Sequence, residues 1–198
     1  MSAIMDLLGK EMTGEAIKEI SAQTGIEEEQ AAAVVNGAVP LLLKALARNT
    51  DDPQGAEALA EALKQDHDGS ILDDIPGFVN QANTAPGQAI LKHVLGDRIM
   101  TVARGLAKLI GIESETVDRI LAILAPIVLA ALARQQQSEG LDVGALAGLL
   151  GQEKKTAESR APEAMDILSS LLDGDGDGDI SDDVADMGTK LLTGLLSR

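Results

Sequence analysis

The chain contains no cysteine, no tryptophan, no tyrosine and a single phenylalanine, Phe78, among its 198 residues. The absence of cysteine excludes disulfide bonds, thiolate nucleophiles and zinc sites with cysteine ligands, and it is compatible with a reducing compartment. Because aromatic side chains are almost absent, the core has to be built mainly from Ala, Leu, Ile and Val. Ala and Leu favour helix over strand, so we expect an all-α fold.

Basic residues and long apolar runs are also scarce. The chain has 16 Lys and Arg against 32 Asp and Glu, a formal net charge of −16, which repels nucleic-acid phosphates and anionic membranes. The most apolar run, at 120–133, contains Pro126 and is shorter than the roughly 20 residues that span a bilayer. The N-terminus shows no basic and apolar signal segment. We therefore expect a soluble cytoplasmic protein without nucleic-acid binding or membrane insertion.

The chain contains an internal repeat. The segment GIEEEQAAAVVNGAVPLLLKALAR at 25–48 aligns without a gap with GIESETVDRILAILAPIVLAALAR at 111–134, an offset of 86. The acidic stretch DHDGSILDDI at 66–75 aligns with DGDGDISDDV at 175–184, an offset of 109. The chain thus divides into halves at 1–83 and 84–198. The extra 23 residues of the second half, the difference between the offsets, predict an exposed charged linker near 152–164. We expect the halves to pack about a pseudo-twofold axis, as one composite domain or two.

Each half is expected to contain the same series of helices. An amphipathic helix ends at Gly25 or Gly111, because glycine readily takes the left-handed conformation that terminates helices. A longer apolar helix follows, then a short one around 55–64 or 141–150. A proline inside a helix removes one hydrogen bond and clashes with the preceding turn, so we expect a kink or a break at Pro40 and Pro126.

The first two helices of each half resemble a helix-turn-helix motif. Reading DNA bases requires Arg, Lys, Asn or Gln on the exposed face of the second helix. Here that helix begins EEEQAAAVV or ESETVDRIL, which is acidic and then apolar. A structural corner is therefore the favoured interpretation, and DNA binding is a less favoured alternative.

The stretch LLDGDGDGDISDDV at 171–184 resembles the calcium loop of an EF-hand. Such a loop places oxygen ligands at positions 1, 3, 5, 7, 9 and 12, with glycine at position 6. Val184 occupies position 12, where the bidentate Glu belongs, so Asp183 has to replace it. The hypothesis is a weak Ca²⁺ site and no other cofactor, with these candidate ligands: Asp173, Asp175, Asp177, the carbonyl group of Asp179, Ser181 and Asp183.

The first acidic loop suggests a second interpretation, without a metal. It has Lys64 at position 1 and, like the second loop, an apolar residue at position 12, Ile75. Both loops therefore fit a glycine turn, an apolar residue that fills the core (Ile71 or Ile180), and an Asp pair that caps the next helix. Both interpretations stay open.

Three features, in this order along the chain, resemble the YidB-like family of uncharacterised bacterial domains. They are the helix-turn-helix-like segment, LAPIVLAALARQQQSEGLDVGALAGLL at 124–150 and DGDGDISDDV at 175–184, and the second half is the closer match. The resemblance implies a bacterial, all-helical protein with a homeodomain-like motif, and it transfers no catalytic residue.

No nucleophile elbow, phosphate-binding loop or HExxH zinc motif is present in the sequence. We therefore expect a non-enzymatic interaction or scaffold module that binds a protein partner or a second copy of itself. A calcium-binding protein that uses the loop at 173–183 is the first alternative. A metal-dependent hydrolase is a more remote one, because no base, nucleophile or arginine cluster accompanies the acidic residues.

Overall fold

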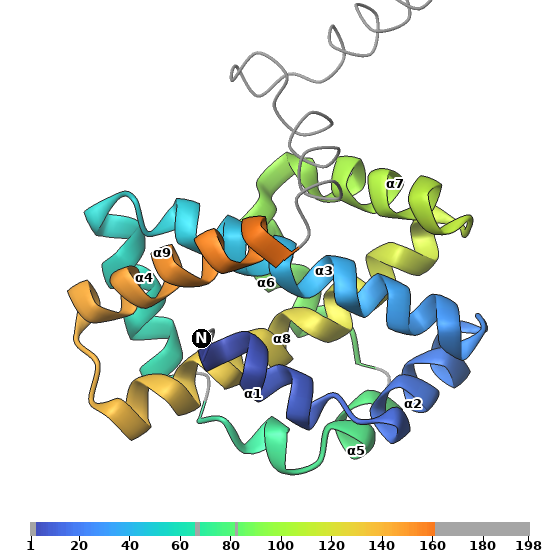
Figure 1. Cartoon of the computed structure of the whole chain (residues 1–198), viewed down its shortest axis with the longest axis horizontal. Coiled ribbons are helices and arrows are strands. Elements are labelled where there is room, and N and C mark those ends of the chain that lie inside the picture. The colour runs from blue at the N-terminus through green and yellow to red at the C-terminus, as the bar shows by residue number, and fades with distance from the viewer. Residues whose placement is uncertain (1–2, 66–67, 82, 161–198) are drawn as a thin grey trace, which may run out of the picture.

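The computed structural model describes residues 3–65, 68–81 and 83–160 (Figure 1). Within these ranges all regular structure is helical, which confirms the predicted all-α fold. The helices, in chain order, are α1 (Ala3–Glu11), α2 (Gly14–Thr24), α3 (Glu28–Asn49), α4 (Pro53–Gln65), α5 (Ile75–Asn80), α6 (Ala85–Leu95), α7 (Ile99–Ile110), α8 (Ser114–Glu139) and α9 (Val143–Arg160). Two short 3₁₀ turns, η1 (Ser70–Asp73) and η2 (Gly96–Arg98), precede α5 and α7.

The two longest apolar helices, α3 and α8, form the centre of the fold. Every residue from 120 to 133 in α8 is buried, so this helix is covered on all sides. Both helices are long and apolar enough to cross a membrane by length and composition alone. In this fold, however, 83% of the most apolar window of α8 and 61% of that of α3 are buried inside the protein.

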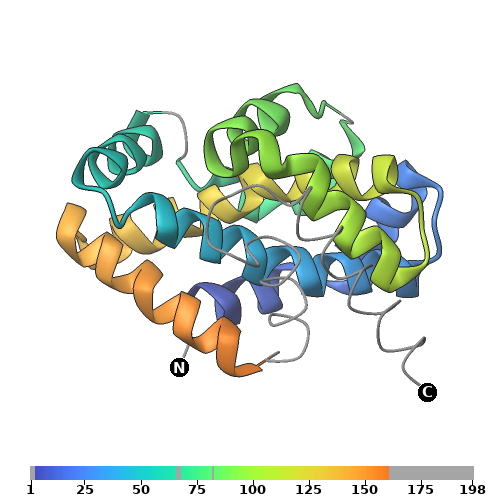
Figure 2. The ribbon, with the colours of Figure 1, turned by 90° about the horizontal axis from the view of Figure 1, so that it is seen from above.

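The remaining helices surround this centre (Figures 1 and 2). The C-terminal helix α9 packs along α3, and α6 and α7 both pack on α8. The helix α4 contacts α8 and α9, and α1 contacts the same two helices. Each central helix is therefore covered by segments that are far away in the sequence, which joins the whole described chain into one aliphatic core.

The two prolines lie inside uninterrupted helices, so the predicted breaks do not occur. Pro40 and Pro126 are both buried among apolar residues. A proline costs a helix interior about 3 kcal/mol, whereas each fully buried Leu or Ile contributes roughly 1.5–3 kcal/mol. Burial of the neighbouring side chains is thus sufficient to keep each helix unbroken. The predicted kink at each proline stays a prediction.

The helix-turn-helix-like corners form where the sequence predicts them. Gly25 ends α2 with a φ of 73°, and Gly111 ends α7 with a φ of 80°. Each glycine donates its N–H to a carbonyl of the helix that it terminates, that of Ser21 or Ala107, at 2.8 Å. The isoleucines that follow, Ile26 and Ile112, pack against the core. Both predicted helix ends are confirmed.

The helix α9 runs further than the sequence indicates. A charged linker is predicted near 152–164, but residues up to Arg160 are helical. The side chain of Glu153 is only 1% exposed, and its Oε1 accepts a hydrogen bond from the backbone N–H of Ile4 at 3.2 Å. Because the first N–H groups of a helix have no partner within it, this carboxylate caps α1 and links it to α9. Residues 161–164 lie outside the described part of the chain.

Candidate functional site

The predicted calcium ligands of the second acidic loop lie outside the described residues. They are Asp173, Asp175, Asp177, Asp179, Ser181 and Asp183. The first acidic loop is described from Asp68 onward, so it shows how this sequence pattern folds. Among the described residues, no three His, Asp or Glu side chains are grouped so that they could hold a metal ion.

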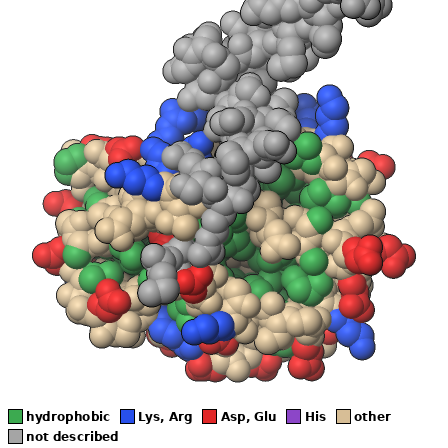
Figure 3. Space-filling view, viewed as in Figure 1, with side chains coloured by type: hydrophobic (Ala, Val, Ile, Leu, Met, Phe, Trp, Pro, Cys, Tyr) green, Lys and Arg blue, Asp and Glu red, His purple; other side chains and the backbone are tan. Residues whose placement is uncertain are grey.

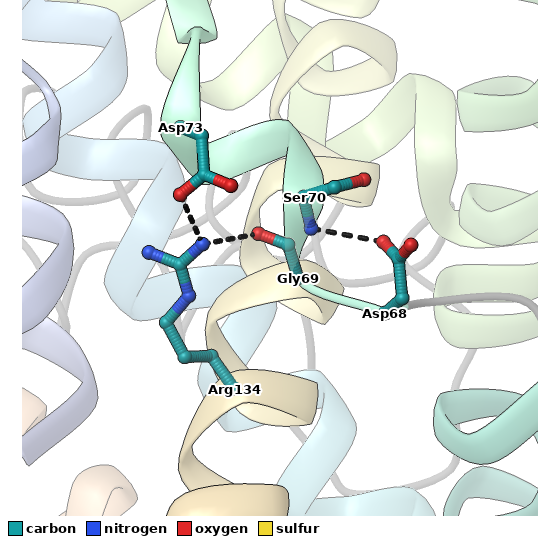
Figure 4. A network of polar contacts seen from close by, with 5 residues as sticks. All are labelled: Asp68, Gly69, Ser70, Asp73 and Arg134. Carbon is teal, nitrogen blue, oxygen red and sulfur yellow. Dashed lines mark hydrogen bonds and ion pairs between the residues drawn. The ribbon is translucent and has the colours of Figure 1, made fainter.

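The first acidic loop is fastened to α8 by Arg134. Its Nη2 donates to the carbonyl oxygen of Gly69 at 2.8 Å and lies 2.6 Å from Oδ1 of Asp73 (Figure 4). Gly69 has a φ of 83°, which turns its carbonyl toward α8. Oδ1 of Asp68 accepts from the N–H of Ser70 at 2.9 Å, which fixes the turn itself. Asp68 and Asp73, in the described part of this loop, are thus bonded to donors of the protein.

The predicted helix-capping role is confirmed for one of the two adjacent aspartates. Oδ1 of Asp74 accepts from the N–H of Gly77 at 2.9 Å and caps α5, whereas Asp73 turns to Arg134 instead. Ile71 packs against the core as predicted, although it is only partly buried, and the neighbouring Leu72 is buried as well. The described part of the first loop therefore folds as a turn and helix cap, with a correction for Asp73.

The sequence analysis did not single out Arg134, although a signal for it exists. Both copies of the long repeat end in Ala-Leu-Ala-Arg, at Arg48 and Arg134. An arginine that follows the same apolar stretch in both copies of the repeat indicates a recurring partner. Its partner is visible only in the folded chain, because the loop that it binds lies 61 residues away from it, measured to Asp73.

The corner between α2 and α3 presents acidic side chains where a DNA-reading motif needs basic ones. Glu27, Glu28 and Glu29 at the start of α3 are exposed. Negative charge suits the positive end of a helix dipole, and Oε1 of Gln30 accepts a capping hydrogen bond from the N–H of Glu27 at 3.2 Å. The arrangement stabilises the corner but opposes a phosphate backbone.

A groove of about 730 Å³ lies between the C-terminal end of α3, α4 and α6. Sequence analysis did not predict it, because its lining comes from four separate helices, α8 included. Five large apolar residues and four polar ones line it, along with small residues of α4 and α6: Leu46, Leu59, Ile90, Val94 and Leu129, and Arg48, Asn49, Asp52 and His93.

The end of this groove is fixed by hydrogen bonds and by a close approach of two helices. Nδ2 of Asn49 donates to the carbonyls of His93 and Val94 at 3.4 and 3.3 Å, which ties α3 to the last turn of α6. A Cβ atom on Gly55 would lie 2.0 Å from the carbonyl oxygen of Asn49, so only glycine permits this spacing. Oδ2 of Asp52 accepts from the N–H of Gly55 at 3.2 Å and caps α4.

A smaller hollow of about 310 Å³ lies between α1, α2 and α3. Its lining is mostly apolar and includes Met5, Met12 and Val39. Figure 3 shows that, on the face viewed there, hydrophobic side chains gather near the middle and acidic side chains lie mainly around the edge. The larger groove is the better candidate site, because both apolar and polar side chains line it, and the polar ones can orient a partner.

A family model described as a bacterial protein of unknown function, DUF937, matches residues 6–135. The chain belongs to this family. YidB is a member of DUF937, so the resemblance stated from the sequence is confirmed. No curated protein and no solved structure matches the chain. The residues that match the family model include the groove lining, Arg134 and the first acidic loop of this DUF937 protein. The match ends within α8, before the second acidic loop.

Proposed function

We propose that this DUF937 protein is a non-enzymatic interaction module that binds an amphipathic helix of a protein partner. The binding site is the groove between α3, α4 and α6, and its volume of about 730 Å³ is the observation that carries the proposal. Grooves of this kind take up apolar side chains spaced at i, i+3 or i+4, and i+7 along one face of a helix. Leu59 of α4 and Ile90 of α6 provide apolar surface for such side chains.

The chemistry of the partner follows from charge. With a formal net charge of −16, the protein attracts cationic partners and repels anionic ones. A helix with Leu-type side chains on one face and Lys or Arg on the other matches both the apolar floor and the overall field. A nucleic acid matches neither, which supports a protein as the partner.

The polar groups of the groove support recognition better than catalysis. The side chain of Asn49 is bonded to carbonyls of α6, and that of Asp52 caps α4. A general base has to be within hydrogen-bond reach of a proton on its substrate. These two groups are instead committed to holding the groove walls.

A fluorescently labelled Leu/Lys amphipathic peptide tests this proposal by fluorescence anisotropy. Ala58 is exposed on α4 and lines the groove, whereas Ala33 is exposed on α3 and does not line it. We expect Ala58→Gln to weaken binding about tenfold, because the longer side chain obstructs the groove, and Ala33→Gln to leave it unchanged. Equal affinities of the two variants would show that the peptide binds elsewhere and would refute the proposal.

We further propose that the protein consists of two copies of one helical unit, at 1–83 and 84–198. The helices α3 and α8 begin at Glu28 and Ser114, which reproduces the offset of 86 in the sequence repeat. Each follows a left-handed glycine and is followed by another helix, α4 or α9. In addition, α3 packs against α7 and α9, and α8 against α2 and α4, which supports a pseudo-twofold arrangement.

Calcium binding by the second acidic loop is the second candidate function. It is favoured by the seven Asp residues between 173 and 186, whose mutual repulsion a divalent cation would relieve. Calorimetric titration of chelator-treated protein with CaCl₂ tests it. Heat at millimolar calcium that disappears in Asp177→Asn would establish the site, and no heat in the unaltered chain would eliminate it.

A further inference from the structure

The helices α6 and α7 form a basic segment in an acidic protein. From residue 85 to 110, which includes both helices and η2, the chain has four basic residues and one acidic residue. The basic residues are Lys92, Arg98, Arg104 and Lys108, and the acidic one is Asp97. The rest of the chain has 12 basic and 31 acidic residues. The positive charge of α6 and α7 is therefore a local feature that the net charge of −16 does not show.

The two cations of α7 differ from the arginines of α8 in their contacts. In α8, Arg134 pairs with Asp73, and Arg119 donates to the carbonyl oxygen of Gln23. The side chains of Arg104 and Lys108, by contrast, meet no carboxylate and no hydrogen-bond acceptor within the described ranges. Their positive charge is thus not neutralised by the described part of the protein, although acidic residues are twice as numerous as basic ones.

Arg104 and Lys108 share one exposed side of α7 with Met100. The three residues follow each other at intervals of four, which places them one turn apart along the same side of a helix. All three are exposed. On the opposite side of the helix, Val102 and Leu106 are buried, and α7 packs on α8 and α3. The surface of Met100, Arg104 and Lys108, here called the α7 face, is therefore presented to solvent by a helix that the core holds in place.

The spacing of the two cations is unfavourable for the helix itself. Like charges four residues apart on a helix repel each other and destabilise it. Lys108 lies in the last turn, where a cation suits the negative end of the helix dipole, but Arg104 lies near the middle of α7, beyond the reach of this effect. Two carboxylates from another molecule would remove the repulsion. The α7 face therefore favours a partner that brings negative charge to it.

We propose that the α7 face binds an acidic helix of a protein partner. Two Glu or Asp side chains at i and i+4 of such a helix lie one turn apart, which matches the spacing of Arg104 and Lys108. Arg104 holds one carboxylate through two parallel hydrogen bonds, and Lys108 pairs with the other. Met100 provides an unbranched, flexible apolar side chain, which adapts its shape to an apolar residue of the partner.

A short acidic helix fits this face better than an extended anionic surface does. Along the axis of α7, the face from Met100 to Lys108 is about 12 Å long. Charges more than about 8 Å apart are largely screened at physiological ionic strength, so a helix that covers only this face meets mainly its two cations. A membrane or a nucleic acid extends further and meets acidic side chains as well, such as the exposed Glu113 and Glu115 at the start of α8.

The α7 face is separate from the groove of the proposed function. The groove lies between α3, α4 and α6, and none of its described lining residues belongs to α7. Figures 1 and 2 show α4 and α7 on opposite sides of the molecule. The two sites also select opposite charges, because the groove is proposed to take a cationic helix. Binding at the α7 face is therefore independent of the groove and can be tested without it.

Fluorescence anisotropy of a labelled helical peptide, with Glu at i and i+4 beside a Leu, tests the proposal on the full chain at low ionic strength. We expect Arg104→Glu with Lys108→Glu to weaken binding at least about tenfold, because attraction becomes repulsion. The matched control, Lys10→Glu with Lys18→Glu, makes the same change in net charge at exposed positions of α1 and α2 and should leave the affinity unchanged. No binding by the unaltered chain, or an equal loss in both double variants, would overturn the proposal.

Two further measurements identify the site and the class of partner. Ala58→Gln, which obstructs the groove, should leave the affinity for the acidic peptide unchanged, and a loss would place the peptide in the groove and overturn the proposal. Sedimentation with vesicles of phosphatidylcholine and phosphatidylserine should show no binding. Vesicle binding that Arg104→Glu with Lys108→Glu abolishes would assign the face to a lipid surface instead. The anisotropy assay of the groove with the Leu/Lys peptide is unaffected by either result, so failure of one proposal leaves the other standing.

Discussion

Replacing Gly87 with alanine is expected to destabilise the fold, although alanine is the better helix former. Gly87 is buried in the first turns of α6, where that helix crosses α8. A Cβ atom at this position would lie 1.7 Å from the carbonyl oxygen of Ala122, and 2.5 and 2.9 Å from its carbonyl carbon and Cα. These are backbone atoms of a buried helix, so α6 has to move away by more than about 1 Å to reach van der Waals distance.

The size of the effect follows from two opposed terms. Overpacking of a well-packed core costs typically about 1–3 kcal/mol, because neighbouring side chains lose contacts as the backbone shifts. Leu91, one turn further along α6, is fully buried and would lose part of its contact with the core. Replacing glycine with alanine in a helix by itself stabilises that helix by up to about 1 kcal/mol. We therefore expect a net loss of about 1–2 kcal/mol in the free energy of unfolding.

Urea denaturation followed by circular dichroism measures this difference directly. The matched control is Gly148→Ala in α9, because Gly148 is exposed and a Cβ atom there meets nothing within 4 Å. The control should be stabilised by up to about 1 kcal/mol. The changes in the free energy of unfolding of the two variants are therefore expected to have opposite signs. If Gly87→Ala is as stable as Gly148→Ala, then α6 does not lie against α8 as described.

Three further predictions use the same assay. Asp74→Ala should cost about 0.5–2 kcal/mol of stability, because it removes the N-cap of α5. Asp73→Ala should cost less than about 1 kcal/mol, because that carboxylate is 71% exposed in its ion pair with Arg134. Equal costs for the two variants would contradict their different roles. Gly111→Ala should cost about 1–2 kcal/mol of stability, because alanine is strained at a φ of 80°. A Cβ atom has open space there, so the cost comes from the backbone alone. An unchanged stability would contradict the left-handed helix end. Leu121→Ala should cost about 2–5 kcal/mol, because the side chain is fully buried at the centre of α8, and a loss under 1 kcal/mol would place it at the surface.

The sequence by itself determined the helical class, the corners and the family. Abundant Ala and Leu, together with the near absence of aromatic residues, allow an aliphatic core of helices and little else. The helix ends at Gly25 and Gly111 follow from local chemistry, because glycine alone tolerates the left-handed conformation without strain. The same local chemistry predicts the cap of α5 by Asp74. Such features need only neighbouring residues, so a sequence pattern is sufficient to find them.

Only the tertiary structure decided which side chains meet across the fold. Asp73 and Asp74 are adjacent and chemically identical, yet one pairs with Arg134 and the other caps a helix. Residues 152–160 are charged enough to resemble a linker, but they belong to α9, where Glu153 bonds to the first turn of α1. The groove likewise exists only where α3, α4 and α6 converge. Each of these outcomes depends on partners far away in the sequence, whose positions are set by burial of the shared core rather than by local pattern.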